Sequence, residues 1–186
     1  MVLAALEQLC LLYPAHIEKE DKRLFHQVMR YFTRDEMDRM LVEFRHPSWV
    51  EDRQQRETLS FLAERNISYV AVDAPQFPTR TTMPPLVAAT SKIGYVRLHG
   101  RNRDTYFARN VSAADRFDYL YTPDELEEWA PKVRELADGT DVTYVMFNNC
   151  KYDYAPRNAR ELAEILGPEL VAPWEGATAG QLGLGL

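Results

Sequence analysis

The stretch from Leu41 to Trp49, LVEFRHPSW, constrains the fold of this chain more than any other segment. Its first residues alternate apolar and charged side chains, as a strand with one buried face does. His46 and Pro47 then end the strand, because proline cannot continue a central ladder. A helical pattern follows to Arg65. A strand that runs directly into a helix is half of a βα unit, so the segment predicts an α/β fold.

The rest of the chain repeats this order of strand and helix. Strand patterns cover Leu9 to Tyr13, Met40 to His46, Ile67 to Asp73, Ile93 to Gly100 and Asp141 to Asn149. Helical patterns cover Asp21 to Phe32, Trp49 to Arg65, Thr122 to Ala137 and Pro156 to Leu166, and long loops are expected at 74–92 and 101–121. Repeated βα units predict a parallel sheet covered by helices. We expect one partial (β/α) barrel domain over residues 1–170, followed by a glycine-rich, poorly ordered tail at 171–186.

The composition of the chain limits the kinds of molecule that we expect it to bind. The chain has 22 basic and 28 acidic residues, which gives a formal net charge of -6. This balance argues against a general affinity for nucleic acid or anionic membranes, which basic surfaces supply. Two cysteines are too few for a disulfide framework, and no apolar run is long enough to cross a bilayer. We therefore expect a cytoplasmic protein that is not bound to a membrane.

Polar side chains gather on one face of the predicted sheet. In a closed barrel of parallel strands, one face looks inward and the other meets the helices. We assign the valines, leucines and phenylalanines of the strands to the face that meets the helices. This leaves polar residues of four strands on the inner face, near the C-terminal strand ends. These residues are Glu43, Arg45, Asp73, Arg97, His99 and Asn148. Their convergence favours a functional site, and the alternative is a structural ion pair of Glu43 with Arg97.

The charged members of this set predict binding of a small anion. Arg45 and Arg97, with Arg101 just beyond, are suited to a carboxylate or phosphate, because guanidinium is a planar donor that stays charged. His99 is the candidate general acid or base. Glu43 is either its carboxylate partner or the base itself.

Uncharged side chains complete the candidate site. Asn148 and Asn149 can donate hydrogen bonds to a developing oxyanion or to substrate hydroxyl groups. Tyr119 and Tyr121 can close over a ring or sugar. For Asn149 and the tyrosines, ordinary roles in loop capping and packing stay open.

Three functional classes follow from these residues. The first is a metal-independent acid/base enzyme acting on a small anionic or sugar-like substrate. The second is a divalent-metal-dependent hydrolase or isomerase that uses Glu43, His46, Asp73 and His99 as ligands. No motif such as HExxH supports the second class, and neighbouring arginines would repel a cation, so we expect neither a metal nor a cofactor. The third is a non-catalytic protein that binds an anionic ligand.

Three motifs carry a family resemblance. They are VEFRHPSW at 42–49, YVRLHGR at 95–101, and FNN followed by APRNA within 147–159. They resemble the family known as domain of unknown function 72, the YecE-like proteins, over roughly Leu9 to Leu166. The resemblance implies a TIM-type (β/α) barrel, but no reaction, because the family's activity is not established.

The N-terminus departs from the family pattern. The resemblance implies about three further βα units before Leu9, and a barrel of eight units needs about 250 residues, whereas this chain has 186. We therefore expect an N-terminally truncated, incomplete barrel with about five of eight units. Its free strand edges and exposed inner-face residues, Tyr144 and Met146 among them, predict self-association.

Overall fold

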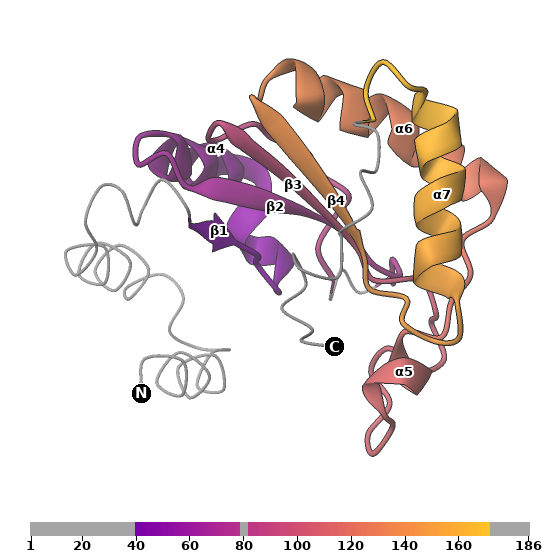
Figure 1. Ribbon diagram of the computed structural model, residues 1–186. Coiled ribbons are helices and arrows are strands. Elements are labelled where there is room, and N and C mark those ends of the chain that lie inside the picture. The colour runs from indigo at the N-terminus through magenta and orange to yellow at the C-terminus, as the bar shows by residue number, and fades with distance from the viewer. Residues whose placement is uncertain (1–39, 79–81, 172–186) are drawn as a thin grey trace, which may run out of the picture. The chain divides into compact units, whose positions relative to one another are not determined.

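The computed structural model describes residues 40–78 and 82–171, and its centre is a parallel sheet (Figure 1). The strand order is β1 (Leu41–Val42), β2 (Ser68–Asp73), β3 (Ile93–Leu98) and β4 (Val142–Phe147). Every neighbouring pair is parallel. The predicted α/β class is therefore confirmed. The predicted strand Leu9 to Tyr13, the predicted helix Asp21 to Phe32 and residues 172–186 of the predicted tail lie outside the described residues.

Described helices lie between β1 and β2, between β3 and β4, and after β4, whereas the described part of the segment between β2 and β3 contains none. These helices are η2 (Pro47–Val50, a 3-10 helix), α4 (Asp52–Ala63), α5 (Ala113–Arg116), α6 (Pro123–Asp138) and α7 (Tyr154–Leu166). The predicted helices after Trp49, Thr122 and Pro156 are confirmed with shifted ends. The short α5 was missed because four residues carry no helical period. Among the described helices, none has the length and apolar character to cross a membrane.

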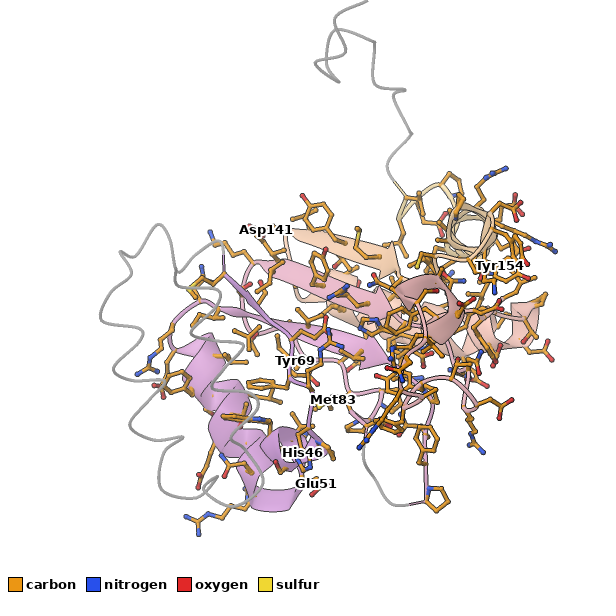
Figure 2. The ribbon with its side chains drawn as sticks, turned by 90° about the horizontal axis from the view of Figure 1, so that it is seen from below. His46, Glu51, Tyr69, Met83, Asp141 and Tyr154 are labelled. Atoms are coloured by element: carbon orange, nitrogen blue, oxygen red, sulfur yellow. The ribbon has the colours of Figure 1, made fainter. Side chains whose placement is uncertain are left out.

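The ends of the helices follow from local hydrogen bonds. At the start of α6, the Thr122 side chain accepts from the backbone N–H of Glu125, and the Glu125 carboxylate accepts from the backbone N–H of Thr122. This reciprocal box satisfies two groups that the helix leaves unpaired. The chain enters α4 differently: His46 caps η2 by accepting from the N–H of Ser48, and Glu51 ends η2 (Figure 2).

Strand β1 is much shorter than the predicted strand Met40 to His46. Only two residues pair with β2. The following Phe44 is buried and stacks on Trp49 of η2, with ring centroids 4.7 Å apart. After Val42 the chain leaves the ladder and turns into η2, where Trp49 packs on Phe44.

One face of the sheet packs on helices. Val96 and Leu98 of β3 lie on this face and are completely buried. Gly94 lies on the same face, and a Cβ atom there would come within 2.9 Å of the Leu136 side chain of α6. The absence of a side chain at Gly94 therefore lets α6 approach β3 closely.

The opposite face of the sheet carries Arg97 and the residues beside it on the neighbouring strands. In the register of the sheet, Arg97 pairs with Val72 of β2 and with Met146 of β4. Parallel neighbours in register share a face, so these three residues lie on one side. Tyr144 and Met146 of β4 lie on this face and are exposed.

The prediction that Asp73 shares this face is wrong. Asp73 pairs in register with Leu98, on the helix side, whereas Val72 pairs with Arg97. All six residues of β2 are buried. Because a strand buried on both faces shows no contrast between apolar and polar positions, hydrophobicity could not orient it.

Candidate functional site

Three side chains converge on the carboxylate of Glu43. Oε2 accepts a hydrogen bond from Nη1 of Arg97 at 2.6 Å. Oε1 lies 3.0 Å from Nη2 of Arg45 and 3.2 Å from Nε2 of His99. We call these four residues the Glu43 cluster. The sequence placed all four together, and the structure brings them into direct contact.

The sheet fixes the positions of these groups. Arg97 belongs to β3, and His99 continues β3 because its backbone N–H donates to the carbonyl of Asp73 at 3.0 Å. Glu43 follows β1, one residue after the ladder ends. All of them lie at the C-terminal ends of the strands, where parallel α/β folds place their ligand sites.

The cations around Glu43 set its protonation. Burial alone would raise the pKa of this carboxyl. The hydrogen bond with His99 and the charges of Arg45, His99 and Arg97 outweigh burial and lower the pKa to about 2. Glu43 is therefore ionised at neutral pH, and its charge holds the two arginines in place.

The members of the cluster differ sharply in exposure. The side chain of Arg45 is 65% exposed and that of Arg97 is 30% exposed. The imidazole of His99 is buried, and its Nδ1 has no hydrogen-bond partner in the described structure. Both guanidinium groups can therefore meet a ligand from solvent, whereas Nδ1 of His99 is closed to it.

Asp73 forms a second cluster on the helix side of the sheet. Its carboxylate accepts from Nε of Arg101 at 3.2 and 3.0 Å, from the hydroxyl of Tyr121 at 2.6 Å and from Nε1 of Trp129 at 3.0 Å. These donors use both oxygens of a buried carboxylate, which satisfies its charge. The cluster ties β2 to α6 and to the segment before α6.

The predicted anion ligand Arg101 belongs to this second cluster. Besides Asp73, its guanidinium donates to Glu128 at 2.9 Å and to Glu125 at 3.4 Å. Burial would lower the pKa of Arg101, but Asp73 and Glu128 raise it above its ordinary value. Three carboxylates already surround this guanidinium, so its charge is met within the protein.

Gly100 explains why Arg101 leaves the inner face. Simple alternation would place Arg97, His99 and Arg101 on one side. Gly100 has φ +88°, a conformation that favours glycine, and a Cβ atom there would lie 2.7 Å from Cβ of Tyr119. The turn at Gly100 ends the alternation of the strand.

The remaining predicted site residues contact the protein itself. Tyr121 is buried, and its hydroxyl accepts from the N–H of Gly100 at 2.8 Å. Asn149 is buried and donates from Nδ2 to Tyr119 O and to Asn158 Oδ1, each at 2.8 Å. Asn148 follows Met146 on the inner face and is half-buried.

The four candidate metal ligands are not brought together. Glu43 and His99 are in contact, but Asp73 lies on the other face of the sheet. Nδ1 of His46 instead lies 2.8 Å from Oγ of Ser48. Within residues 40–78 and 82–171, no three His, Cys, Asp or Glu side chains are grouped closely enough to hold a metal ion.

Two aromatic residues near the cluster were missed. Phe117 packs on His99 with ring centroids 5.4 Å apart, and Tyr106 packs on Phe117 at 6.4 Å. Both belong to the region 101–121, which the sequence predicted only as a loop. The signal was present in its aromatic residues, since five of them, Tyr106, Phe107, Phe117, Tyr119 and Tyr121, lie within 101–121.

Comparison with known protein families identifies the family of this chain. The model for "Protein of unknown function DUF72" matches residues 4–180. The chain belongs to the DUF72 family. The resemblance carried by the three motifs is thereby confirmed. The chain is also similar to UPF0759 protein YunF of Bacillus subtilis (strain 168), with 30% identity over 132 residues.

Solved DUF72 structures share the fold. A DUF72 family protein of Thermotoga maritima MSB8 is 36% identical, with a TM-score of 0.61 over 72% of this chain. One from Enterococcus faecalis V583 is 27% identical, with a TM-score of 0.66 over 77% of this chain. The matches cover 48% and 52% of those chains, and the match to YunF covers 69% of this chain and 46% of YunF. The chain thus spans about half the length of the relatives it matches.

Proposed function

We propose that the Glu43 cluster binds a small anionic ligand through Arg45 and Arg97. The observation that carries this proposal is the imbalance of charge: two guanidinium groups share one carboxylate, and both reach solvent. A guanidinium bound on one side can still donate from its other N–H groups to a carboxylate or phosphate. The surplus positive charge stands out in a chain whose net charge is -6.

A purely structural role explains the cluster less well. Neutralising Glu43 requires a single arginine, and Arg97 already supplies it at 2.6 Å. Arg45 is 65% exposed, and an ion pair at such a position contributes little to stability. Ligand binding therefore accounts for the presence of the second guanidinium, that of Arg45, which a contribution to stability does not explain.

Calorimetric titration of the full chain tests the proposal. We expect inorganic phosphate or acetate to bind wild type saturably, and Arg97→Gln to weaken binding at least about tenfold, as loss of a charge-assisted hydrogen bond implies. The matched control is Arg53→Gln, on the exposed surface of α4, where Arg53 pairs with Glu57. Equal binding by wild type and Arg97→Gln, or no saturable binding, would refute the proposal.

A second candidate function is proton transfer by His99, which would make the protein a metal-independent acid/base enzyme. Its support is the contact of Nε2 with Glu43 combined with the unpartnered Nδ1. A carboxylate that accepts from Nε2–H orients the ring and leaves the lone pair of Nδ1 as the base. Glu43 itself, with a pKa of about 2, is too weak a base for this role.

The tautomer of His99 tests the second candidate directly. Nitrogen-15 NMR of the neutral imidazole is expected to show a proton on Nε2 and none on Nδ1. A proton on Nδ1 would contradict the proposed role. Because Nδ1 is buried and Phe117 packs on the ring, a reaction there also requires side chains around His99 to move, and chemical shifts of Phe117 on ligand addition would report this movement.

A cytoplasmic location is also a proposal. It is supported by the small number of cysteines, only Cys10 and Cys150 in 186 residues. Fractionation of cells that express the tagged protein tests it, and recovery from a membrane or extracellular fraction would refute it.

A further inference from the structure

Three aromatic side chains from two loops meet beyond the strand ends. Phe77 follows β2, and Tyr106 and Phe107 follow β3. The ring centroid of Phe107 lies 5.1 Å from that of Phe77 and 5.0 Å from that of Tyr106, and Phe77 and Tyr106 are 6.4 Å apart. We call these residues the aromatic cluster. Phe107 is 56% exposed although its ring packs on the two others.

The loop that presents Tyr106 and Phe107 is held by many hydrogen bonds. The guanidinium of Arg116 donates to three backbone carbonyls, those of Thr105, Tyr106 and Ala108. Oδ1 of Asn102 accepts from the N–H of Thr105 at 3.3 Å. Arg116 belongs to α5, which lies beyond the C-terminal ends of the strands (Figure 1). The exposed ring is therefore carried by a fixed loop rather than by a loose one.

The aromatic cluster is continuous with the Glu43 cluster. Phe117 bridges them, because it packs on Tyr106 on one side and on His99 on the other. Electrostatics agree with this placement. Burial raises the pKa of the Tyr106 phenol, and the charges of Arg45 and Glu43 act on it in opposite directions.

We propose that the aromatic cluster is a second part of the ligand site, which binds the ring of an anion whose charged group lies on Arg45 and Arg97. The ligand class is then a phosphate or carboxylate attached to a ring with an apolar face, either a planar aromatic ring or a sugar. This inference rests on the proposed anion site. Aromatic side chains recognise both kinds of ring through their faces, and the gain comes from packing in addition to burial.

Paired probes separate the ring from the charge. Methyl phosphate, phenyl phosphate and glucose 6-phosphate carry the same charged group, and only the last two carry a ring. In calorimetric titrations, wild type is expected to bind at least one ring phosphate about three- to tenfold more tightly than methyl phosphate, which corresponds to the usual worth of an aromatic contact. Which ring is preferred identifies the planar or the sugar source.

Substitution of the exposed ring gives the sharper test. Phe107→Ala should remove the preference for the ring and leave the affinity for methyl phosphate unchanged. Tyr152→Ala is the matched control, since Tyr152 is 78% exposed and lies outside the aromatic cluster. Thermal melts of both variants check that they fold as wild type does.

The outcomes distinguish this inference from the proposal beneath it. Equal affinities of wild type for all three probes, or a ring preference that survives Phe107→Ala, would overturn the aromatic site while methyl phosphate binding remains dependent on Arg97. Absence of saturable methyl phosphate binding would overturn both. A ring preference lost in Phe107→Ala and kept in Tyr152→Ala supports the inference.

Discussion

Replacing Glu43 by glutamine should make the stability of this protein less dependent on pH. Glutamine has nearly the same shape but no charge, so Glu43→Gln removes the attraction for Arg45 and Arg97 and the titration of the carboxyl. The sheet and the aromatic contacts stay in place. The change therefore isolates the electrostatic part of the Glu43 cluster.

The magnitude follows from the pKa of Glu43. The carboxyl has a pKa of about 2 in the folded protein against an ordinary value of 4.5. At 1.36 kcal/mol for each pH unit, the charged form contributes about 3 kcal/mol to folding. Because the folded-state pKa is lowered, this contribution is complete above pH 4.5 and is lost as the pH falls toward 2. About 2 kcal/mol of it should be gone at pH 3.

Urea unfolding of wild type and Glu43→Gln at pH 6 and pH 3 measures the effect. We expect the difference in free energy of unfolding between the two proteins to shrink by about 2 kcal/mol between these pH values. Glu127→Gln, at an exposed position of α6, is the control and should show no such change. A difference between wild type and Glu43→Gln that is the same at both pH values would refute the assignment of Glu43 as the ionised centre of the cluster.

Three further changes test other parts of the structure. Arg97→Ala should lower the free energy of unfolding by less than about 3 kcal/mol, because Glu43 keeps two other partners. The same variant should lose phosphate binding. A larger loss of stability, measured by urea unfolding, would favour a structural ion pair. Asp73→Ala should cost about 3–5 kcal/mol, because it leaves the guanidinium of Arg101 without its main partner, and a loss below about 1 kcal/mol would contradict this. The 186-residue chain should self-associate in light scattering, and Tyr144→Glu should reduce the association; a monodisperse wild-type monomer would refute that expectation.

Alternation along the strands predicted the Glu43 cluster, because the strands involved contrast apolar with charged positions. In β3, Val96 and Leu98 face the helices while Arg97 and His99 face the other way. The same rule failed for Asp73 because β2 is buried on both faces. Periodicity cannot orient a strand whose residues are all buried.

Two other parts of the site depend on structural features that the periodicity of the sequence does not predict. Arg101 joins Asp73 because Gly100, with φ +88°, ends the alternation of β3, and no count of residues along a strand foresees such a turn. Phe117 packs on His99 and Tyr106 packs on Phe117, and hydrogen bonds of Arg116 shape the loop that carries Tyr106. Those contacts join residues that are not neighbours in the sequence, so local sequence patterns do not predict them.

The most direct test of the anion site is an NMR titration that resolves the Nε–Hε signals of the arginines. Inorganic phosphate added to the full chain at neutral pH should shift the signals of Arg45 and Arg97 in a saturable manner. The signal of Arg101, whose guanidinium is surrounded by Asp73 and two glutamates, should stay in place. Unchanged signals of Arg45 and Arg97, or shifts no larger than that of Arg101, would contradict the account.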